Sequence, residues 1–302
     1  MRKDLARLET EKRNLNTVDI DVVDTARVLE MINEEDQTVA FAVQKQLPAI
    51  TALTDAYIRT LEKGGRVFYI GAGTSGRLAF IDAAELVPTY DIEEGVVEGI
   101  MAGGLPAMRR AREFEEDKAE NGTRDLKERN FCEKDMLIGV AASGRTPYVI
   151  NAMQYAKTLG AVTGSISCVS DAEMSALADY PVEVVTGQEV VLGSTRMKAA
   201  TAEKLVLNMM STAAFIRTGR TYKNYLLGQT TTEKSYYRQI RWMAGETNLP
   251  EEEVEKFFKA AGNDTKVALC MMKTGLSAEE SRELIEHHGG RLREALREKG
   301  RD

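Results

Sequence analysis

Two short loops, each between an apolar segment and a helix-forming segment, constrain the fold of this chain more than any other feature. The first loop, residues 71–77 (GAGTSGR), follows apolar residues 67–70, and the second, residues 141–146 (AASGRT), follows residues 136–140. This order predicts two strand–loop–helix units, in which backbone N–H groups and hydroxyls at the helix start face one point. The arrangement suits a phosphate, and its repetition indicates a sugar phosphate. The candidate phosphate ligands are Thr74, Ser75, Gly76, Arg77, Ser143, Gly144 and Thr146.

The rest of the first 225 residues continues the alternation of strands and helices. Further strands are expected near residues 96–98, 162–168 and 182–185, and helices over residues 108–118, 148–159 and from about residue 194. The pattern predicts an α/β fold with a doubly wound parallel sheet. Residues 1–48 predict a helical arm that packs on a partner subunit, residues 49–225 the sugar phosphate domain, and residues 235–302 a small all-α domain.

The C-terminal region contains an internal repeat. Residues 257–269 resemble residues 284–296, and Gly262 of the first copy corresponds to Gly289 of the second. Two helical hairpins of this kind predict a compact module with a structural role.

Composition excludes several function classes. The 302-residue chain has a net charge of −7 with interleaved signs, so a nucleic-acid partner is not expected. No segment is apolar for long enough to cross a membrane, and the first residues lack the apolar core of a signal peptide. The three cysteines are scattered and the two histidines adjacent, which predicts no disulfide framework, no metal site and a cytoplasmic location.

The first loop also matches the G-x-G-x-x-G pattern of dinucleotide-binding proteins, with Glu98 near the spacing of a ribose-binding acid. Two observations weigh against a nicotinamide cofactor. Thr74 and Ser75 place hydroxyls at the centre of the loop, where they can bind a terminal phosphate. The second hydroxyl-bearing loop has no role in dinucleotide binding. We therefore expect no cofactor.

Candidate acids and bases are carboxylates. Glu85 lies near the end of the helix that follows the first loop, among alanine, leucine and valine residues. Partial burial there would favour the protonated carboxyl, whereas a solvated glutamate at a helix end is the alternative. Residues 113–117 are a run of acids whose spacing selects none of them as catalytic.

A third loop, residues 187–198, precedes another expected helix. Ser194 follows a glycine and is placed to cap that helix, while Arg196 and Lys198 bring positive charge to it. Glu189 is the one acid in an otherwise small and apolar turn. These four residues are candidates for further contacts with the substrate.

At these loops the chain closely resembles the N-acetylmuramic acid 6-phosphate etherases, members of the sugar isomerase (SIS) domain family. The resemblance covers nearly the whole chain and includes residues 10–14, 71–78, 141–149, 193–198 and 204–209 and the C-terminal repeat. A related regulator of glucokinase shares the architecture and binds sugar phosphates without turnover. The chain departs from the usual family pattern at Ala84, Leu86, Leu192, Ala200 and Glu203.

The resemblance implies a lyase of cell-wall recycling that needs no cofactor, cleaves a lactyl ether and acts as a homodimer with sites near the interface. The family's two catalytic glutamates correspond to Glu85, expected to protonate the leaving oxygen, and Glu116, expected to handle the C2 proton. A regulator that binds sugar phosphates without turnover, and a ketose–aldose isomerase on the same fold, are the alternatives.

Overall fold

The computed structural model describes residues 9–227 and 232–301, and the chain forms two compact units. The first unit comprises Met1–Glu85 and Glu94–Thr212, and the second comprises Leu86–Glu93 and Ala213–Asp302. The division into an arm, a sugar phosphate domain and a C-terminal domain stays a prediction.

The first unit is built on a five-stranded parallel sheet in the order β2-β1-β3-β4-β5. Its strands are β1 (Val67–Gly71), β2 (Val97–Met101), β3 (Met136–Val140), β4 (Val162–Ser167) and β5 (Tyr180–Glu183). The predicted doubly wound sheet is confirmed. Strands β1 and β3 are neighbours, and Gly71 pairs with Val140 at their carboxyl ends. The two predicted phosphate loops therefore leave the sheet side by side and at the same level.

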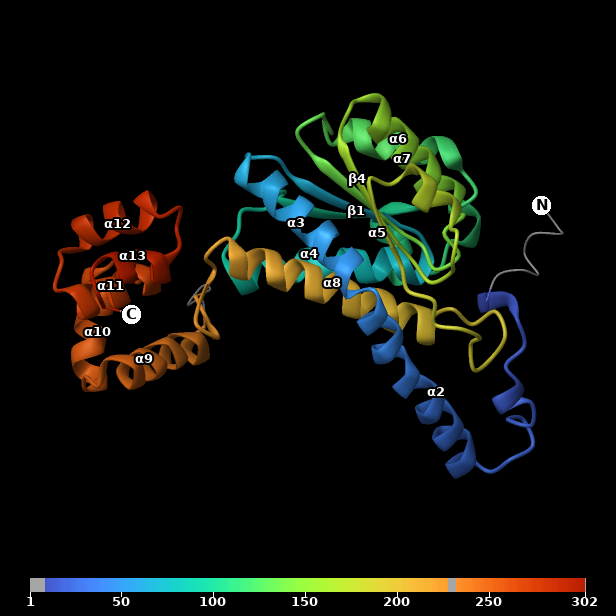
Figure 1. The fold of residues 1–302 in the computed structure, drawn as a ribbon, viewed down its shortest axis with the longest axis horizontal. Coiled ribbons are helices and arrows are strands. Elements are labelled where there is room, and N and C mark those ends of the chain that lie inside the picture. The colour runs from blue at the N-terminus through green and yellow to red at the C-terminus, as the bar shows by residue number, and fades with distance from the viewer. Residues whose placement is uncertain (1–8, 228–231, 302) are drawn as a thin grey trace. The chain divides into compact units, whose positions relative to one another are not determined.

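Helices cover both faces of the sheet (Figure 1). Helices α6 (Ala119–Glu128) and α7 (Pro147–Thr158) lie on one face, and α3 (Leu47–Glu62), α4 (Gly73–Tyr90) and α8 (Lys198–Arg217) on the other. Alternation along β1 explains this, since successive side chains point to opposite faces. Phe68 joins the core cluster beneath α6 and α7, whereas Tyr69 forms a hydrogen bond of 3.2 Å with Tyr57 of α3.

The helix predicted over residues 108–118 is wrong. The chain forms α5 (Gly104–Arg109), leaves the helix at Arg110 in an extended conformation, and makes the short 3₁₀ helix η3 (Glu113–Glu115) before α6. The run of arginines at positions 109, 110 and 112 gives this stretch no apolar face to bury, so packing cannot stabilise a longer helix.

The N-terminal residues form two 3₁₀ turns, η1 (Glu9–Glu11) and η2 (Leu15–Thr17), and then α2 (Thr25–Lys45). Asp24 caps α2 by accepting a hydrogen bond from the backbone N–H of Arg27. Helix α2 extends away from the sheet in Figure 1, and its Leu29 and Phe41 are 60% and 66% exposed. The helix thus presents large apolar side chains that the other described residues of its unit leave exposed.

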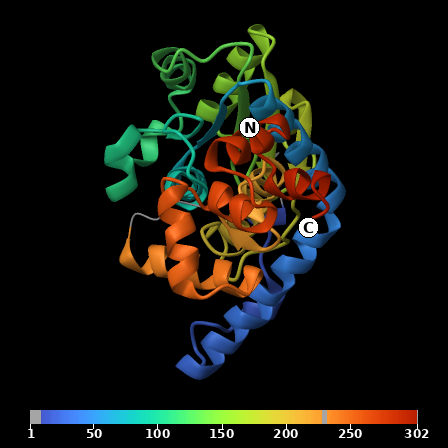
Figure 2. The same cartoon turned by 90° about the vertical axis from the view of Figure 1, so that its left-hand side faces the viewer.

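The second unit consists mainly of the C-terminal helices, drawn orange to red in Figure 2. The short hairpin β6 (Thr221–Tyr222) and β7 (Tyr225–Leu226) precedes helices α9 (Glu233–Thr247), α10 (Glu251–Ala260), α11 (Thr265–Thr274), α12 (Ala278–His287) and α13 (Leu292–Glu298). The predicted repeat is confirmed, because both copies are helical hairpins. Gly262 and Gly289 make the equivalent turns with φ of 75° and 61°.

Candidate active site

The first loop turns directly from β1 into α4, and its glycines make the turn possible. A Cβ on Gly76 would lie 2.8 Å from the carbonyl carbon and oxygen of Gly71, a backbone contact that no side chain can relieve. The Gly76 N–H donates to the Ala72 carbonyl at 3.0 Å. The N–H groups of the three residues before it, Gly73, Thr74 and Ser75, have no partner within the helix. The start of α4 is therefore suited to an anion.

The side chains of this loop differ in their roles. Thr74 is half-buried, whereas Ser75 is buried and its Oγ is hydrogen-bonded to Oε1 of Glu203 at 2.8 Å. The Arg77 guanidinium donates to the carbonyls of Ala107, at 2.7 Å, and Met108. Arg77 therefore ties α4 to the end of α5 and fixes the wall of the first loop.

The second loop is also shaped by its backbone. Gly144 has φ of +64°, and a Cβ there would lie 2.4 Å from the Cβ of Ala172. Ser143 and Thr146 are half-buried, and α7 begins immediately after Thr146. Because β1 and β3 are neighbours, the structure brings the predicted ligands of both loops to one edge of the sheet.

Glu116 lies between the two loops. Its carbonyl accepts a hydrogen bond of 3.1 Å from the Tyr148 N–H at the start of α7. Its exposed side chain lines a cavity of about 120 Å³ together with Gly73, Arg77 and Arg112. The structure therefore joins one of the two predicted catalytic glutamates to both predicted phosphate loops.

Glu85 does not lie at this cavity in the single chain. It is on α4, about 18 Å from Gly73 along the helix axis at a rise of about 1.5 Å per residue. The expected partial burial is wrong, because Glu85 and Ala84 are exposed while Ala83 and Leu86 face the interior. Of the two alternatives for this residue, the solvated glutamate describes the single chain.

The third loop is closed by its own side chains. Glu189 is fully buried and accepts hydrogen bonds from the backbone N–H groups of Lys198, at 2.9 Å, and Ala199, at 3.0 Å. Lys198 is 3% exposed, and its Nζ pairs with Glu35 of α2 at 2.5 Å. Neither Glu189 nor Lys198 reaches the surface here, because both serve the packing of α8. Ser194 is half-buried and Arg196 exposed, so both stay candidates for substrate contacts.

Burial shifts the pKa values of several of these acids. Desolvation raises the pKa of Glu189, although its two backbone hydrogen bonds and Lys198 oppose the shift. Glu35 is also desolvated, but hydrogen bonds from Asn16 and Lys198 lower its pKa overall. Desolvation raises the pKa of Glu203 to about 8. Glu203 is therefore protonated at neutral pH, whereas Glu35 is a carboxylate that compensates Lys198.

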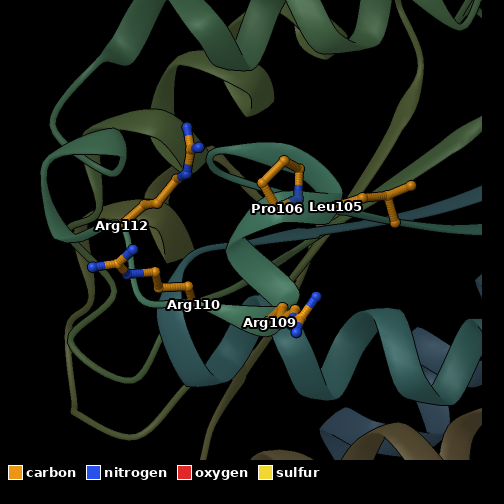
Figure 3. Close-up of a pocket in the computed structure, with 5 residues that line it drawn as sticks. All are labelled: Leu105, Pro106, Arg109, Arg110 and Arg112. Carbon is orange, nitrogen blue, oxygen red and sulfur yellow. The ribbon is translucent and has the colours of Figure 1, made fainter.

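A set of arginines beside the cavity was not singled out from the sequence. Arg109, Arg110 and Arg112, with Leu105 and Pro106, line a second, open cavity of about 720 Å³ (Figure 3). Arg112 lines both cavities, so it brings positive charge to the edge of the site that contains Glu116. The arginine-rich run itself was the available signal.

The structure also bears on the alternatives. Glu98, the acid expected to bind a ribose in a dinucleotide site, forms an ion pair with Arg129. Within residues 9–227 and 232–301, no three or more His, Cys, Asp or Glu side chains gather as a metal site would require. None of the helices in these same residues is long and apolar enough to cross a membrane.

Known proteins resemble this chain over nearly its full length. N-acetylmuramic acid 6-phosphate etherases from Clostridioides difficile and Photobacterium profundum are 43% and 46% identical to it. These matches cover 98% of this chain in both cases, and 97% and 99% of the respective relatives. A family profile described as the glucokinase regulatory protein N-terminal SIS domain matches residues 49–157.

Among solved structures, a phosphoheptose isomerase from Francisella tularensis is similar in fold. It matches with a TM-score of 0.52 at 15% identity and covers 64% of this chain and 100% of its own length. This likeness supports the SIS fold of the first unit. The full-length identity to the curated relatives shows that the chain belongs to the N-acetylmuramic acid 6-phosphate etherase family.

Proposed function

We propose that this protein cleaves the D-lactyl ether of N-acetylmuramic acid 6-phosphate to give N-acetylglucosamine 6-phosphate and D-lactate. Its relatives carry the name of this activity over nearly the full chain. The observation that carries the proposal is the position of Glu116, bonded through its backbone to the start of α7 and lining a cavity at the start of α4. This position supports the assignment of Glu116 as a base at the place where the two proposed phosphate loops meet.

The chemistry requires one base and one acid. In the open-chain sugar, C1 is an aldehyde, so a base can remove the C2 proton. The electron pair forms the C2–C3 double bond as the C3–O bond breaks, and the lactate oxygen leaves with a proton from the acid. Water then adds across the double bond, with its hydroxyl on C3 and a proton on C2. Each acid–base group contributes about 10²- to 10⁴-fold to the rate.

The loops supply orientation. The proposed anchors of the phosphate are the free N–H groups at the start of α4 and the hydroxyls of Thr74, Ser75, Ser143 and Thr146. Arg77 fixes the wall beside it. An anchored phosphate holds the C2–C3 bond at a constant place relative to Glu116, so that proton removal becomes an intramolecular step. We assign Glu116 to the C2 proton.

We further propose that the protein is a cytoplasmic homodimer and that Glu85 acts in the cavity of the partner. Glu85 is exposed and lies about 18 Å along α4 from Gly73, which lines the cavity with Glu116, so we infer that it does not serve the sugar held in that cavity of its own chain. Ile81 on α4 and Leu29 and Phe41 on α2 are exposed apolar side chains that a second copy would cover. The three free cysteines agree with a reducing compartment.

The first test is release of D-lactate from N-acetylmuramic acid 6-phosphate. The wild type should release it, and Glu116→Gln should lower kcat by about 10²- to 10⁴-fold. Binding of N-acetylglucosamine 6-phosphate by that variant, measured by calorimetry, should stay close to wild type. Sugar phosphate binding by the wild type without D-lactate release would instead support the regulator alternative.

A mixing experiment tests the shared site. Glu85→Gln and Glu116→Gln chains, each inactive alone, are unfolded together and refolded to form mixed dimers. If Glu85 crosses to the partner, one site of each mixed dimer is intact, and a random mixture recovers about a quarter of wild-type activity. A mixture as inactive as its components would show that both glutamates act within one chain.

A further inference from the structure

A buried acid stands directly behind the first phosphate loop. Glu203, on α8, is fully buried, and its Oε1 is hydrogen-bonded to Ser75 Oγ at 2.8 Å. Its other oxygen, Oε2, has no hydrogen-bond partner among the described residues. Ser75 itself is 9% exposed and lies in the first turn of α4. A side chain of the interior therefore controls a hydroxyl of the proposed phosphate site.

The single hydrogen bond of Glu203, to Ser75, indicates which of its two carboxyl oxygens carries the proton. Burial without a cation favours the neutral carboxyl, and its pKa of about 8 agrees with this. A neutral carboxyl with its proton on Oε2 would leave a buried O–H donor unsatisfied. With the proton on Oε1, the carboxyl donates to Ser75 Oγ, and only a carbonyl oxygen lacks a partner. An unpaired carbonyl oxygen is tolerated better than an unpaired donor.

The direction of this bond decides what Ser75 can do. A hydroxyl has one proton to donate and two lone pairs to accept with. When Glu203 donates, the Ser75 proton is free for another acceptor. When Glu203 is a carboxylate, Ser75 must donate to it and has no proton left for a ligand.

Among the described residues, the groups around Glu203 supply no compensating cation. After β4, the buried Cys168 thiol interacts with Glu203, and burial raises the pKa of that thiol well above its ordinary value, so it is neutral. Before α8, Glu189 is bonded to the start of that helix. On α4, Asp82 is bonded to Asn208 of α8, and desolvation raises its pKa. Lys204, adjacent on α8, is exposed and interacts with Asp82.

We propose that Glu203 is a positioning residue for the sugar phosphate, whose protonated carboxyl donates to Ser75 Oγ and directs the Ser75 hydroxyl proton toward the phosphate at the start of α4. This inference rests on the phosphate site of the proposed function. Loss of the Glu203 proton removes one donor from the phosphate and places a buried negative charge behind it. Affinity for the sugar phosphate therefore falls as the pH rises through the pKa of Glu203.

The test measures the Kd of N-acetylglucosamine 6-phosphate by calorimetry at pH 7 and pH 9. Wild-type affinity should fall about tenfold, because a group with a pKa of about 8 is mostly deprotonated at pH 9. In the lactate assay KM should rise over the same interval while kcat does not follow it. Glu203→Gln should lose the pH dependence, since its amide nitrogen donates to Ser75 at every pH. Glu203→Leu, which has no donor, should bind more weakly at both pH values.

Glu189→Gln is the matched control, because it alters another buried acid of raised pKa that does not contact Ser75; it should keep the tenfold fall. The ionisation of the ligand phosphate is common to all variants and cancels in the comparison. A tenfold fall that persists in Glu203→Gln would overturn the inference while leaving the phosphate site intact. Absence of binding by the wild type at pH 7 would overturn the proposed function and this inference together.

Discussion

The starts of α4 and α8 are similar in sequence, but their backbone N–H groups have different partners. Both follow a glycine-containing loop with hydroxyl side chains, and both present backbone N–H groups at a helix end. At α8 the protein fills that end itself, because Glu189 accepts two of the N–H groups. At α4 the corresponding place adjoins a cavity lined by Gly73 and Glu116.

The difference shows that a helix start is a binding site only when the chain does not satisfy it. The carboxylate of Glu189 does for α8 what we propose a phosphate does for α4. The acids near the two helix starts differ as well, since Glu189 accepts two hydrogen bonds whereas Glu203 has a single hydrogen bond among the described residues. The start of α8 therefore has a structural role, whereas we propose that the start of α4 binds a ligand.

The largest effect is expected from removing the buried cation at the start of α8. Lys198→Met leaves the buried Glu35 carboxylate without a cation and should lower the free energy of unfolding by about 3–5 kcal/mol, as measured by urea denaturation at neutral pH. Adding Glu35→Met should recover most of the loss. Lys223→Met, which breaks a half-exposed pair with Glu246, should cost about 1 kcal/mol or less. Equal losses of stability in the Lys198 and Lys223 variants would contradict the structural role assigned to Lys198 at the start of α8.

The next effect concerns the acid behind α4 and depends on pH. In the unfolded chain Glu203 loses its proton near its ordinary pKa of 4.5, whereas in the folded chain it keeps the proton up to about pH 8. The unfolded state therefore binds fewer protons in this interval, and stability falls as the pH rises. Between pH 5 and pH 8 the wild type should lose roughly 3 kcal/mol more than Glu203→Gln. Parallel stability curves for the two proteins would contradict the assignment.

A smaller effect is expected from closing the turn into α4. Gly76→Ala forces a Cβ against the Gly71 backbone, so it should cost about 2 kcal/mol of stability and weaken sugar phosphate binding. Gly245→Ala is the control, since a Cβ there meets no atom within 4 Å inside α9. That variant should be as stable as wild type or gain up to about 1 kcal/mol. Unchanged binding in Gly76→Ala would mean that the ligand does not use the start of α4.

The smallest effect concerns charge around the open site. Arg112→Ala should weaken binding of the anionic sugar by several-fold at low ionic strength, and the loss should shrink as salt is added. Lys157→Ala removes the same charge at the far end of α7 and should leave the Kd unchanged. An equal loss of affinity in both variants would indicate that only the net charge of the protein, and not the position of Arg112, affects binding.

Much of the fold could be predicted from the sequence because strand and loop signals are local. The strands near residues 67–70, 136–140 and 162–168 follow from apolar runs, whereas β5 forms at Tyr180–Glu183, two residues before the expected 182–185. The adjacency of β1 and β3, which brings the two loops together, is known only from the structure. The prediction of a helix over residues 108–118 was wrong because this segment has no apolar face that packing could bury. Glycine spacing was sufficient to find the C-terminal repeat.

The candidate site was less predictable because burial is decided by packing. In the sequence, Glu189 and Lys198 are typical of a ligand-binding loop. Only the structure shows that they are buried, Glu189 against the start of α8 and Lys198 against Glu35 of α2. Glu203 was visible in the sequence only as a departure from the usual family pattern, and nothing local indicates that this face of α8 contacts Ser75. Both catalytic glutamates were assigned from the family resemblance, which says nothing about where they lie in space. Only the length of α4 in the structure shows that Glu85 lies far from the cavity that Glu116 lines.

The bond between Lys198 and Glu35 also determines where this molecule can be shortened. Together with the hydrogen bond from Thr17 Oγ1 to the Val190 carbonyl, it fastens the arm to the α/β unit from inside. A version beginning at residue 49 would carry an uncompensated ammonium in its interior. A shortened protein that is meant to keep the native interior of the first unit therefore has to retain Thr17 and helix α2.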